Sequence, residues 1–153
     1  MAQPESLLVE REVRIAARPE TVFAFFTDPD KMIRWKGVMA KLEDRPGGQF
    51  RVTINDRAVA TGRYVEVTPF SRVVFTWGWE GHPVVPPGMS TVEVTFEPDG
   101  NETIVRLVHR DLPTVEEAAN HADGWDHYLP RLAAAASGGD PGPDPNTAPH
   151  HGA

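Results

Sequence analysis

The chain of 153 residues is long enough for one domain with a sizeable hydrophobic core. Its formal net charge of −7 disfavours a nucleic-acid partner, because the phosphates would on average be repelled. The absence of cysteine excludes disulfides, thiolate nucleophiles and cysteine-ligated metals, and it is compatible with a reducing compartment.

The N-terminal part of the chain carries no secretion signal and begins with a predicted strand. Its first residues lack the basic start and apolar run of a signal peptide, and no stretch reaches the roughly 18 apolar residues of a membrane span. We therefore expect a cytoplasmic protein. Alternating apolar residues predict a strand over residues 7–15, and Arg11 lies on its apolar face. This arginine is either an edge residue whose side chain reaches solvent or a cation in a cavity.

Two short helices are predicted next. Pro19 and Glu20 favour a helix start, because proline needs no N–H partner in the first turn and a carboxylate suits the positive end of the helix dipole. A second helix is expected over residues 29–35, with Asp28 or Thr27 as its N-cap. Such a pair between the first strand and the following sheet would close one end of a curved sheet.

Six further strands are expected in the middle of the chain. Turn residues such as Gly47-Gly48 and Asp99-Gly100 separate segments that alternate between apolar and polar side chains. The expected strands cover residues 38–43, 49–55, 57–67, 72–80, 89–97 and 103–110. In the third of these we place the small residues Ala58, Ala60 and Gly62 on the inner face, because small side chains on a concave face leave room.

The 72–80 strand carries large apolar side chains on one face, namely Val73, Phe75, Trp77 and Trp79. Two interpretations are open: the row packs against the terminal helix as core, or it forms one wall of an apolar pocket. The proline-rich residues 81–88 are too apolar for a merely solvated loop, and we expect them to cover the mouth of such a pocket.

A long amphipathic helix is predicted near the end of the chain. Its apolar stripe has steps of three and four residues and consists of Ala118, Ala122, Trp125, Leu129, Leu132 and Ala136. Residues 137–153 contain glycine, proline, aspartate and histidine but little apolar bulk, so we expect a disordered tail. The domain is therefore expected to span residues 1–136.

Five short motifs follow one another in the order and spacing of a known fold. They are Thr27-Asp28-Pro29 followed by Trp35, Gly47-Gly48-Gln49-Phe50-Arg51, the strand segments 90–96 and 103–109, and Gly124-Trp125. Over residues 7–136 the chain resembles the START-like or SRPBCC superfamily, in the AHSA-type branch named after activators of the heat-shock chaperone ATPase. The resemblance implies an α+β helix-grip fold, in which a curved seven-stranded antiparallel sheet wraps around the long C-terminal helix. It implies no single reaction, since the superfamily includes lipid carriers, aromatic polyketide cyclases, dehydratases and chaperone-binding modules.

Our leading hypothesis is a protein that binds a small hydrophobic or amphipathic molecule in a cavity between the sheet and the terminal helix. The expected lining consists of Trp35, Phe50, Val52, Tyr64, Phe75, Trp77, Val94, Leu107, His109, Trp125 and Leu129. Trp35 is expected near the opening. Arg11 is the expected polar anchor near His109, since the first and last strands are neighbours in this superfamily.

Two other functions stay open. His109 lies on an alternating apolar face, either as a satisfied core residue or as the acid or base of a cyclase- or dehydratase-type enzyme acting on a polyketide-like substrate. The other alternative is a chaperone-interacting module, which would need an exposed apolar patch.

We predict neither a cofactor nor a metal site. His121 and His127 are six residues apart, a spacing that does not place two ligands on one face of a helix. Asp123 and Asp126 are assigned to the outer face of that helix. The oligomeric state stays open, and a homodimer formed through an edge strand is compatible with the sequence.

Overall fold

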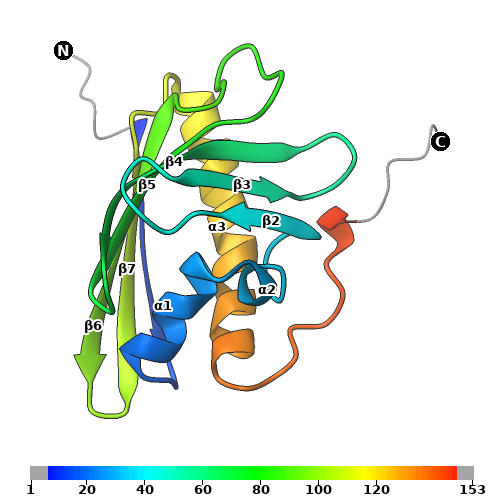
Figure 1. Cartoon of the computed structure of the whole chain (residues 1–153). Helices are drawn as coiled ribbons and strands as arrows, with labels where there is room; N and C mark the ends of the chain where they lie inside the picture. Colours follow the sequence, from blue (N-terminus) through cyan, green and yellow to red (C-terminus); the bar gives the residue numbers. More distant parts are fainter. Residues whose placement is uncertain (1–6, 148–153) are drawn as a thin grey trace.

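The computed structural model describes residues 7–147 and contains a seven-stranded antiparallel sheet (Figure 1). The strands are β1 (Val9–Ile15), β2 (Met39–Leu42), β3 (Gln49–Thr53), β4 (Val59–Thr68), β5 (Arg72–Trp77), β6 (Ser90–Asp99) and β7 (Glu102–Arg110). Their order across the sheet is β1-β7-β6-β5-β4-β3-β2, and every neighbouring pair is antiparallel. The predicted number of strands and the α+β class are confirmed.

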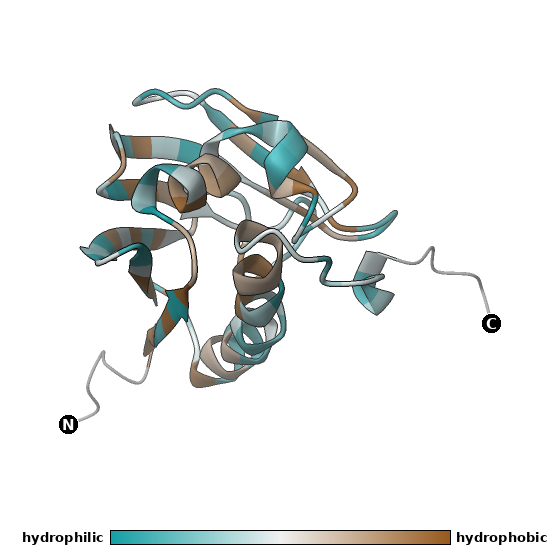
Figure 2. Cartoon of the chain, turned by 90° about the horizontal axis from the view of Figure 1, so that it is seen from below, coloured by the Kyte–Doolittle hydropathy of each residue, from teal (hydrophilic) through white to brown (hydrophobic). Residues whose placement is uncertain are grey.

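Three α-helices complete the fold of the described residues. The long helix α3 (Val115–Ala136) lies in the hollow of the sheet, and α1 (Pro19–Thr27) and α2 (Pro29–Met32) lie at one end of it (Figure 1). Figure 2 shows the sheet curving around α3, so the predicted helix-grip arrangement is confirmed. Within residues 7–147, no helix combines the length and the apolar content needed to cross a membrane.

The helix starts follow the predicted capping chemistry. The Asp28 side chain accepts a hydrogen bond from the N–H of Asp30 at 2.9 Å and thereby caps α2. The Thr114 hydroxyl accepts a hydrogen bond from the N–H of Glu117 at 3.0 Å and caps α3 in the same way. These caps fix where α2 and α3 begin, and α2 ends at Met32, before the predicted Trp35.

Aromatic side chains fill the interior between the sheet and α1. Phe50 stacks on Phe75 with ring centroids 4.1 Å apart, and Tyr64 meets Phe50 edge-on at 5.7 Å. The Tyr64 hydroxyl donates a hydrogen bond to the carbonyl oxygen of Phe26 in α1 at 2.8 Å. All four side chains are buried. This part of the interior is therefore packed core.

The face of β4 that carries small residues points inward, as predicted. Ala60 and Tyr64 are fully buried, whereas Val65 on the other face is 54% exposed. At Gly62 the chain comes so close to β5 that an added Cβ would lie 1.9 Å from the carbonyl oxygen of Thr76. The small residues thus serve close strand packing as well as interior space.

The segment after α3 forms polar contacts with that helix. The Arg131 guanidinium donates hydrogen bonds to backbone carbonyl oxygens of this segment at 3.0 and 3.2 Å. Asp144 is buried and lies 2.9 Å from Nε2 of His127 in α3. Polar contacts thus join residues 141–144 to α3, and the disorder expected over residues 137–153 stays a prediction. Residues 148–153 of the predicted tail lie outside the described residues.

Candidate functional site

A pocket of about 450 Å³ lies between the sheet and the N-terminal half of α3. From α3 it is lined by Glu117, Asn120, His121, Gly124, Trp125 and Tyr128. From the sheet and its turns it is lined by Ile54, Asn55, Ala58, Trp77 and Trp79. Pro145 and Asn146, from the segment after α3, complete the wall together with Lys36 and His82.

Gly124 leaves open space in the middle of the helical wall. Residues 121, 124, 125 and 128 follow at steps of one, three or four and share one face of α3. A Cβ atom added at Gly124 would meet nothing within 4 Å. Because glycine weakens a helix interior, its presence here makes room for a pocket at the expense of helix stability.

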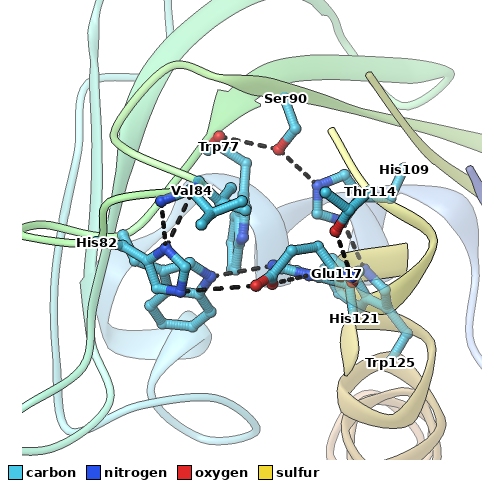
Figure 3. A network of polar contacts seen from close by, with 11 residues as sticks. Trp77, His82, Val84, Ser90, His109, Thr114, Glu117, His121 and Trp125 are labelled. Atoms are coloured by element: carbon cyan, nitrogen blue, oxygen red, sulfur yellow. Dashed lines mark hydrogen bonds and ion pairs between the residues drawn. The ribbon is translucent and has the colours of Figure 1, made fainter. Parts of the chain in front are cut away.

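His109 lies behind the pocket in a continuous series of hydrogen bonds (Figure 3). The Trp125 indole donates to Nδ1 of His109 at 3.0 Å, so Nδ1 must be the unprotonated nitrogen. Nε2 therefore carries the proton and donates to Ser90 Oγ at 2.7 Å, while the Ser90 hydroxyl donates to the carbonyl oxygen of Trp77 at 2.9 Å. Burial, followed by His121 and Lys36, holds the pKa of His109 well below its usual value. His109 is thus a neutral side chain with both nitrogens occupied.

His121 forms a second tryptophan–histidine pair in the pocket wall. The Trp79 indole donates to Nε2 of His121 at 3.0 Å. Nδ1 of His121 lies 2.8 Å from the carbonyl oxygen of Glu117, to which it donates (Figure 3). The His109 and His121 rings meet edge-on, with centroids 5.0 Å apart. Burial lowers the pKa of His121, against the opposing effect of Glu117. Both histidines are therefore neutral acceptors already used by indole N–H groups.

The proline-rich loop lies against α3 through His82. Its Nδ1 accepts hydrogen bonds from the N–H groups of Val84 and Val85 at 3.1 and 2.9 Å, which fixes the ring. Its Nε2 lies 3.9 Å from a carboxylate oxygen of Glu117 (Figure 3). Since His82 and Glu117 both line the pocket, this loop forms part of its wall.

Lys36 brings a buried amine among the aromatic rings of the pocket. Its Nζ lies 3.7 Å from the ring centroid of Tyr128, 5.0 Å from that of Trp125 and 5.1 Å from that of Trp77. The residue is only 5% exposed, and no hydrogen bond or ion pair joins its ammonium to any residue within 7–147. Burial lowers the pKa of Lys36 to about 7, although the Asp144 carboxylate acts in the opposite direction.

Trp77 offers a second polar group without a partner. Its side chain is 2% exposed and lines the pocket, yet its indole N–H is buried and forms no hydrogen bond with any described residue. A buried donor left without an acceptor costs about 1–3 kcal/mol. The other two indoles of the pocket, Trp79 and Trp125, both have histidine acceptors.

Comparisons with known proteins agree with this architecture. The sequence matches the family model described as activator of Hsp90 ATPase homolog 1-like protein over residues 16–137. The chain belongs to this family. Among curated proteins, none matches the sequence.

Solved structures of similar proteins include members of this family. An AHSA1-like protein from Rhizobium etli is 46% identical, with 90% of this chain and 86% of that chain covered and a TM-score of 0.72. CalU16 from Micromonospora echinospora is 26% identical over 90% of this chain and 77% of that chain, with a TM-score of 0.72. An HSP90 activator from Plasmodium falciparum is 24% identical over 82% of this chain and 93% of that chain, with a TM-score of 0.67. The last likeness shows the fold alone.

Only two of the predicted lining residues, Trp77 and Trp125, line the pocket of this AHSA1-like domain. The other nine are buried in the core or behind the pocket and are Trp35, Phe50, Val52, Tyr64, Phe75, Val94, Leu107, His109 and Leu129. Trp35 lies under α1, where its indole donates to the carbonyl oxygen of Phe25 at 3.0 Å. The pocket therefore lies nearer one end of the sheet than the prediction placed it.

Arg11 does not serve as a partner of His109. Its guanidinium binds the Asp126 carboxylate on α3 at 2.7 Å and is partly exposed. Its Cα partner in the strand pair is Leu107, whereas His109 faces Val9. Arg11 thus joins the edge strand β1 to α3 and does not line the pocket.

The sequence reasoning missed Lys36 and His121. His121 could have been found, because it lies three residues after Ala118 and four before Trp125 and so belongs to a wider apolar stripe. Lys36 follows a short helix and precedes a turn, where no periodicity shows which side chains face inward. Among residues 7–147, no group of three or more histidine, aspartate or glutamate side chains is arranged to hold a metal ion.

Proposed function

We propose that the pocket binds a small, largely apolar molecule with a flat ring system. The observation that carries this proposal is the combination of three indoles and the Tyr128 ring around an open space of about 450 Å³. Flat aromatic walls offer large apolar contact areas and stacking surfaces to a planar guest. The glycine at position 124 supports the proposal, because a large side chain there would project into the space.

The hydrogen bonds of His109 favour a binding role for the site over catalysis by this histidine. A general acid or base must be free to exchange a proton with its substrate. Both ring nitrogens of His109 are occupied within the protein, and the side chain is fully buried. His121 is occupied in the same way by Trp79 and the Glu117 carbonyl. These contacts support a binding role for this site, because neither His109 nor His121 is free for a cyclase- or dehydratase-type step.

The proposal is tested by filling the pocket from the helix. Gly124→Trp places a large ring in the open space, while Gly124→Ala is the matched control that adds only a methyl group. The probe is N-phenyl-naphthylamine, a neutral aromatic dye that fluoresces in apolar sites. We expect the wild-type protein and Gly124→Ala to bind it with affinities within about twofold, and Gly124→Trp to bind it at least about tenfold more weakly.

One outcome of the dye-binding measurement would contradict the proposal. Binding that is unchanged in Gly124→Trp, in a variant that still unfolds cooperatively, would place the dye elsewhere and remove the pocket as a binding site. Native mass spectrometry of the purified wild-type protein and of Gly124→Trp provides a second readout, because a retained molecule should be present only in the former.

A further inference from the structure

The polar groups that face the pocket differ in whether they have a hydrogen-bond partner within the protein. Two of its acceptors are occupied: His121 accepts from Trp79, and Asn55 Oδ1 accepts from the backbone N–H groups of Arg57 and Ala58. The groups of its lining without a hydrogen bond among the described residues include the Lys36 ammonium, the Trp77 indole N–H and the Tyr128 hydroxyl. The ammonium and the indole can only donate, so a guest that satisfies them must bring hydrogen-bond acceptors.

The ammonium and the Trp77 indole belong to the same part of the pocket wall, because Lys36 Nζ is 5.1 Å from the centroid of the Trp77 ring. A buried ammonium is normally paired with an anion, because desolvation of an unpaired charge is costly. Here the aromatic rings of Trp77, Trp125 and Tyr128 surround it instead, and a ring face compensates for only part of this cost.

The charged groups around Lys36 leave room for a negative charge. His109 and His121 are neutral, because one ring nitrogen of each accepts a hydrogen bond from an indole and only the other carries a proton. Asp144 acts on Lys36 electrostatically without forming an ion pair; one of its oxygens lies 2.9 Å from Nε2 of His127, and the other is buried without a hydrogen bond among the described residues. Glu117, the carboxylate of the pocket lining, is eleven residues before Tyr128 on α3, about 16 Å along the helix.

We propose that the pocket selects aromatic molecules that carry an anionic oxygen group, such as a carboxylate or phenolate, which pairs with Lys36 and accepts the Trp77 indole N–H. This inference rests on the proposed binding function and names the chemical class of its ligand. The rings stack on the indoles, and the charge lies at the Lys36 end of the pocket. Arrival of the anion returns Lys36 to its charged form, so binding takes up a proton when the solution is above the pKa of about 7 of the free protein.

The test compares two probes that share one ring system. Anilinonaphthalene sulfonate is anionic, and N-phenyl-naphthylamine lacks the sulfonate. Lys36→Met keeps the length of the side chain and removes its charge, and it should fold because a buried charge is replaced by an apolar group. Lys41→Met is the matched control, since it changes the net charge equally at an exposed position of β2 outside the pocket lining.

We expect Lys36→Met to weaken binding of the sulfonate at least about tenfold and to change binding of the neutral probe less than about twofold. Lys41→Met should change neither by more than about twofold. In the wild-type protein, sulfonate affinity should fall by up to about tenfold per pH unit above pH 7, while affinity for the neutral probe stays constant. In Lys36→Met this pH dependence should be absent.

Two results would separate this inference from the proposed function. In the first result, the wild-type protein and Lys36→Met bind the sulfonate equally, while Gly124→Trp still weakens binding of the neutral probe. This result would overturn the anion site and keep the pocket. Failure of both probes to bind any variant, or binding insensitive to Gly124→Trp, would overturn the proposed function and with it the anion site.

Discussion

At the scale of single residues, two histidines at the pocket, His109 and His121, are each paired with an indole. Trp125 donates to His109 and Trp79 donates to His121, so each histidine must keep a bare nitrogen. Protonation of that nitrogen would set two donors against each other in a buried place. The histidines therefore act as fixed acceptors that orient the indoles, and Trp77 is the pocket indole left without one among the described residues.

This pairing predicts how stability depends on pH. The pKa of both histidines is lowered in the folded protein, so the unfolded chain binds more protons once the pH falls below the ordinary value of 6.5. The stability that the neutral histidines contribute is fully present above pH 6.5 and is lost below it. We expect the free energy of unfolding to fall by up to about 1.4 kcal/mol per pH unit for each histidine.

Urea unfolding between pH 7.5 and pH 5 measures this slope, and ring nitrogen chemical shifts identify the tautomer. His109 should stay neutral, with the proton on Nε2, throughout this range. A titration of His109 with a midpoint near pH 6.5 would contradict the hydrogen-bond assignment.

At the scale of the elements, two glycines have opposite roles. Gly124 interrupts the wall of α3, where an added Cβ meets open space, whereas Gly62 lies where β4 approaches β5 so closely that a Cβ would collide with the Thr76 carbonyl oxygen. One glycine therefore makes a pocket and the other makes a strand pair.

Alanine substitutions should separate these roles. Gly124→Ala is expected to raise the free energy of unfolding by about 0.5–1 kcal/mol, because alanine restricts the unfolded chain and suits a helix interior. Gly62→Ala is expected to lower it by more than about 1 kcal/mol, since backbone has to move to admit the methyl group. Thermal or urea unfolding of the two variants provides the comparison, and destabilisation by Gly124→Ala would mean that the helical wall is closed.

Strand parity predicted which side chains point inward, but not which inward space is filled. The row of Val73, Phe75 and Trp77 faces inward as predicted, because alternation along a strand has a fixed period of two. Whether Phe75 lines a cavity depends on what α1 and neighbouring strands place opposite it, and Phe50 stacks there. These contacts join segments that are far apart in the sequence. The prediction from the sequence therefore assigned much of the packed core to the pocket lining.

At the scale of the whole molecule, the order of elements was predictable and the position of the pocket was not. Seven strands, two short helices and a long helix follow from periodicity and turn residues, and the family match covers all of these elements except β1. The pocket depends on residues that have no such signal: Lys36 after α2, and Pro145 and Asn146 in a segment held by polar contacts. Such positions are decided by how distant parts of the chain meet.

The pocket gathers three of the four tryptophans of the chain, and the fourth lies in the core. Each tryptophan has a distinct environment for its indole N–H. Trp77 has no acceptor, Trp79 and Trp125 donate to histidines, and Trp35 donates to a backbone carbonyl under α1. Indole N–H signals are therefore four separate reporters within one molecule.

The most direct measurement of the central claim is a nitrogen–proton NMR titration of the wild-type protein with anilinonaphthalene sulfonate. A guest in the pocket should shift the indole signals of Trp77, Trp79 and Trp125, with Trp77 shifted most because its N–H gains an acceptor. The Trp35 signal should stay in place. Equal shifts at Trp35, or no shift at Trp77 when the dye is bound, would contradict a binding pocket between the sheet and α3.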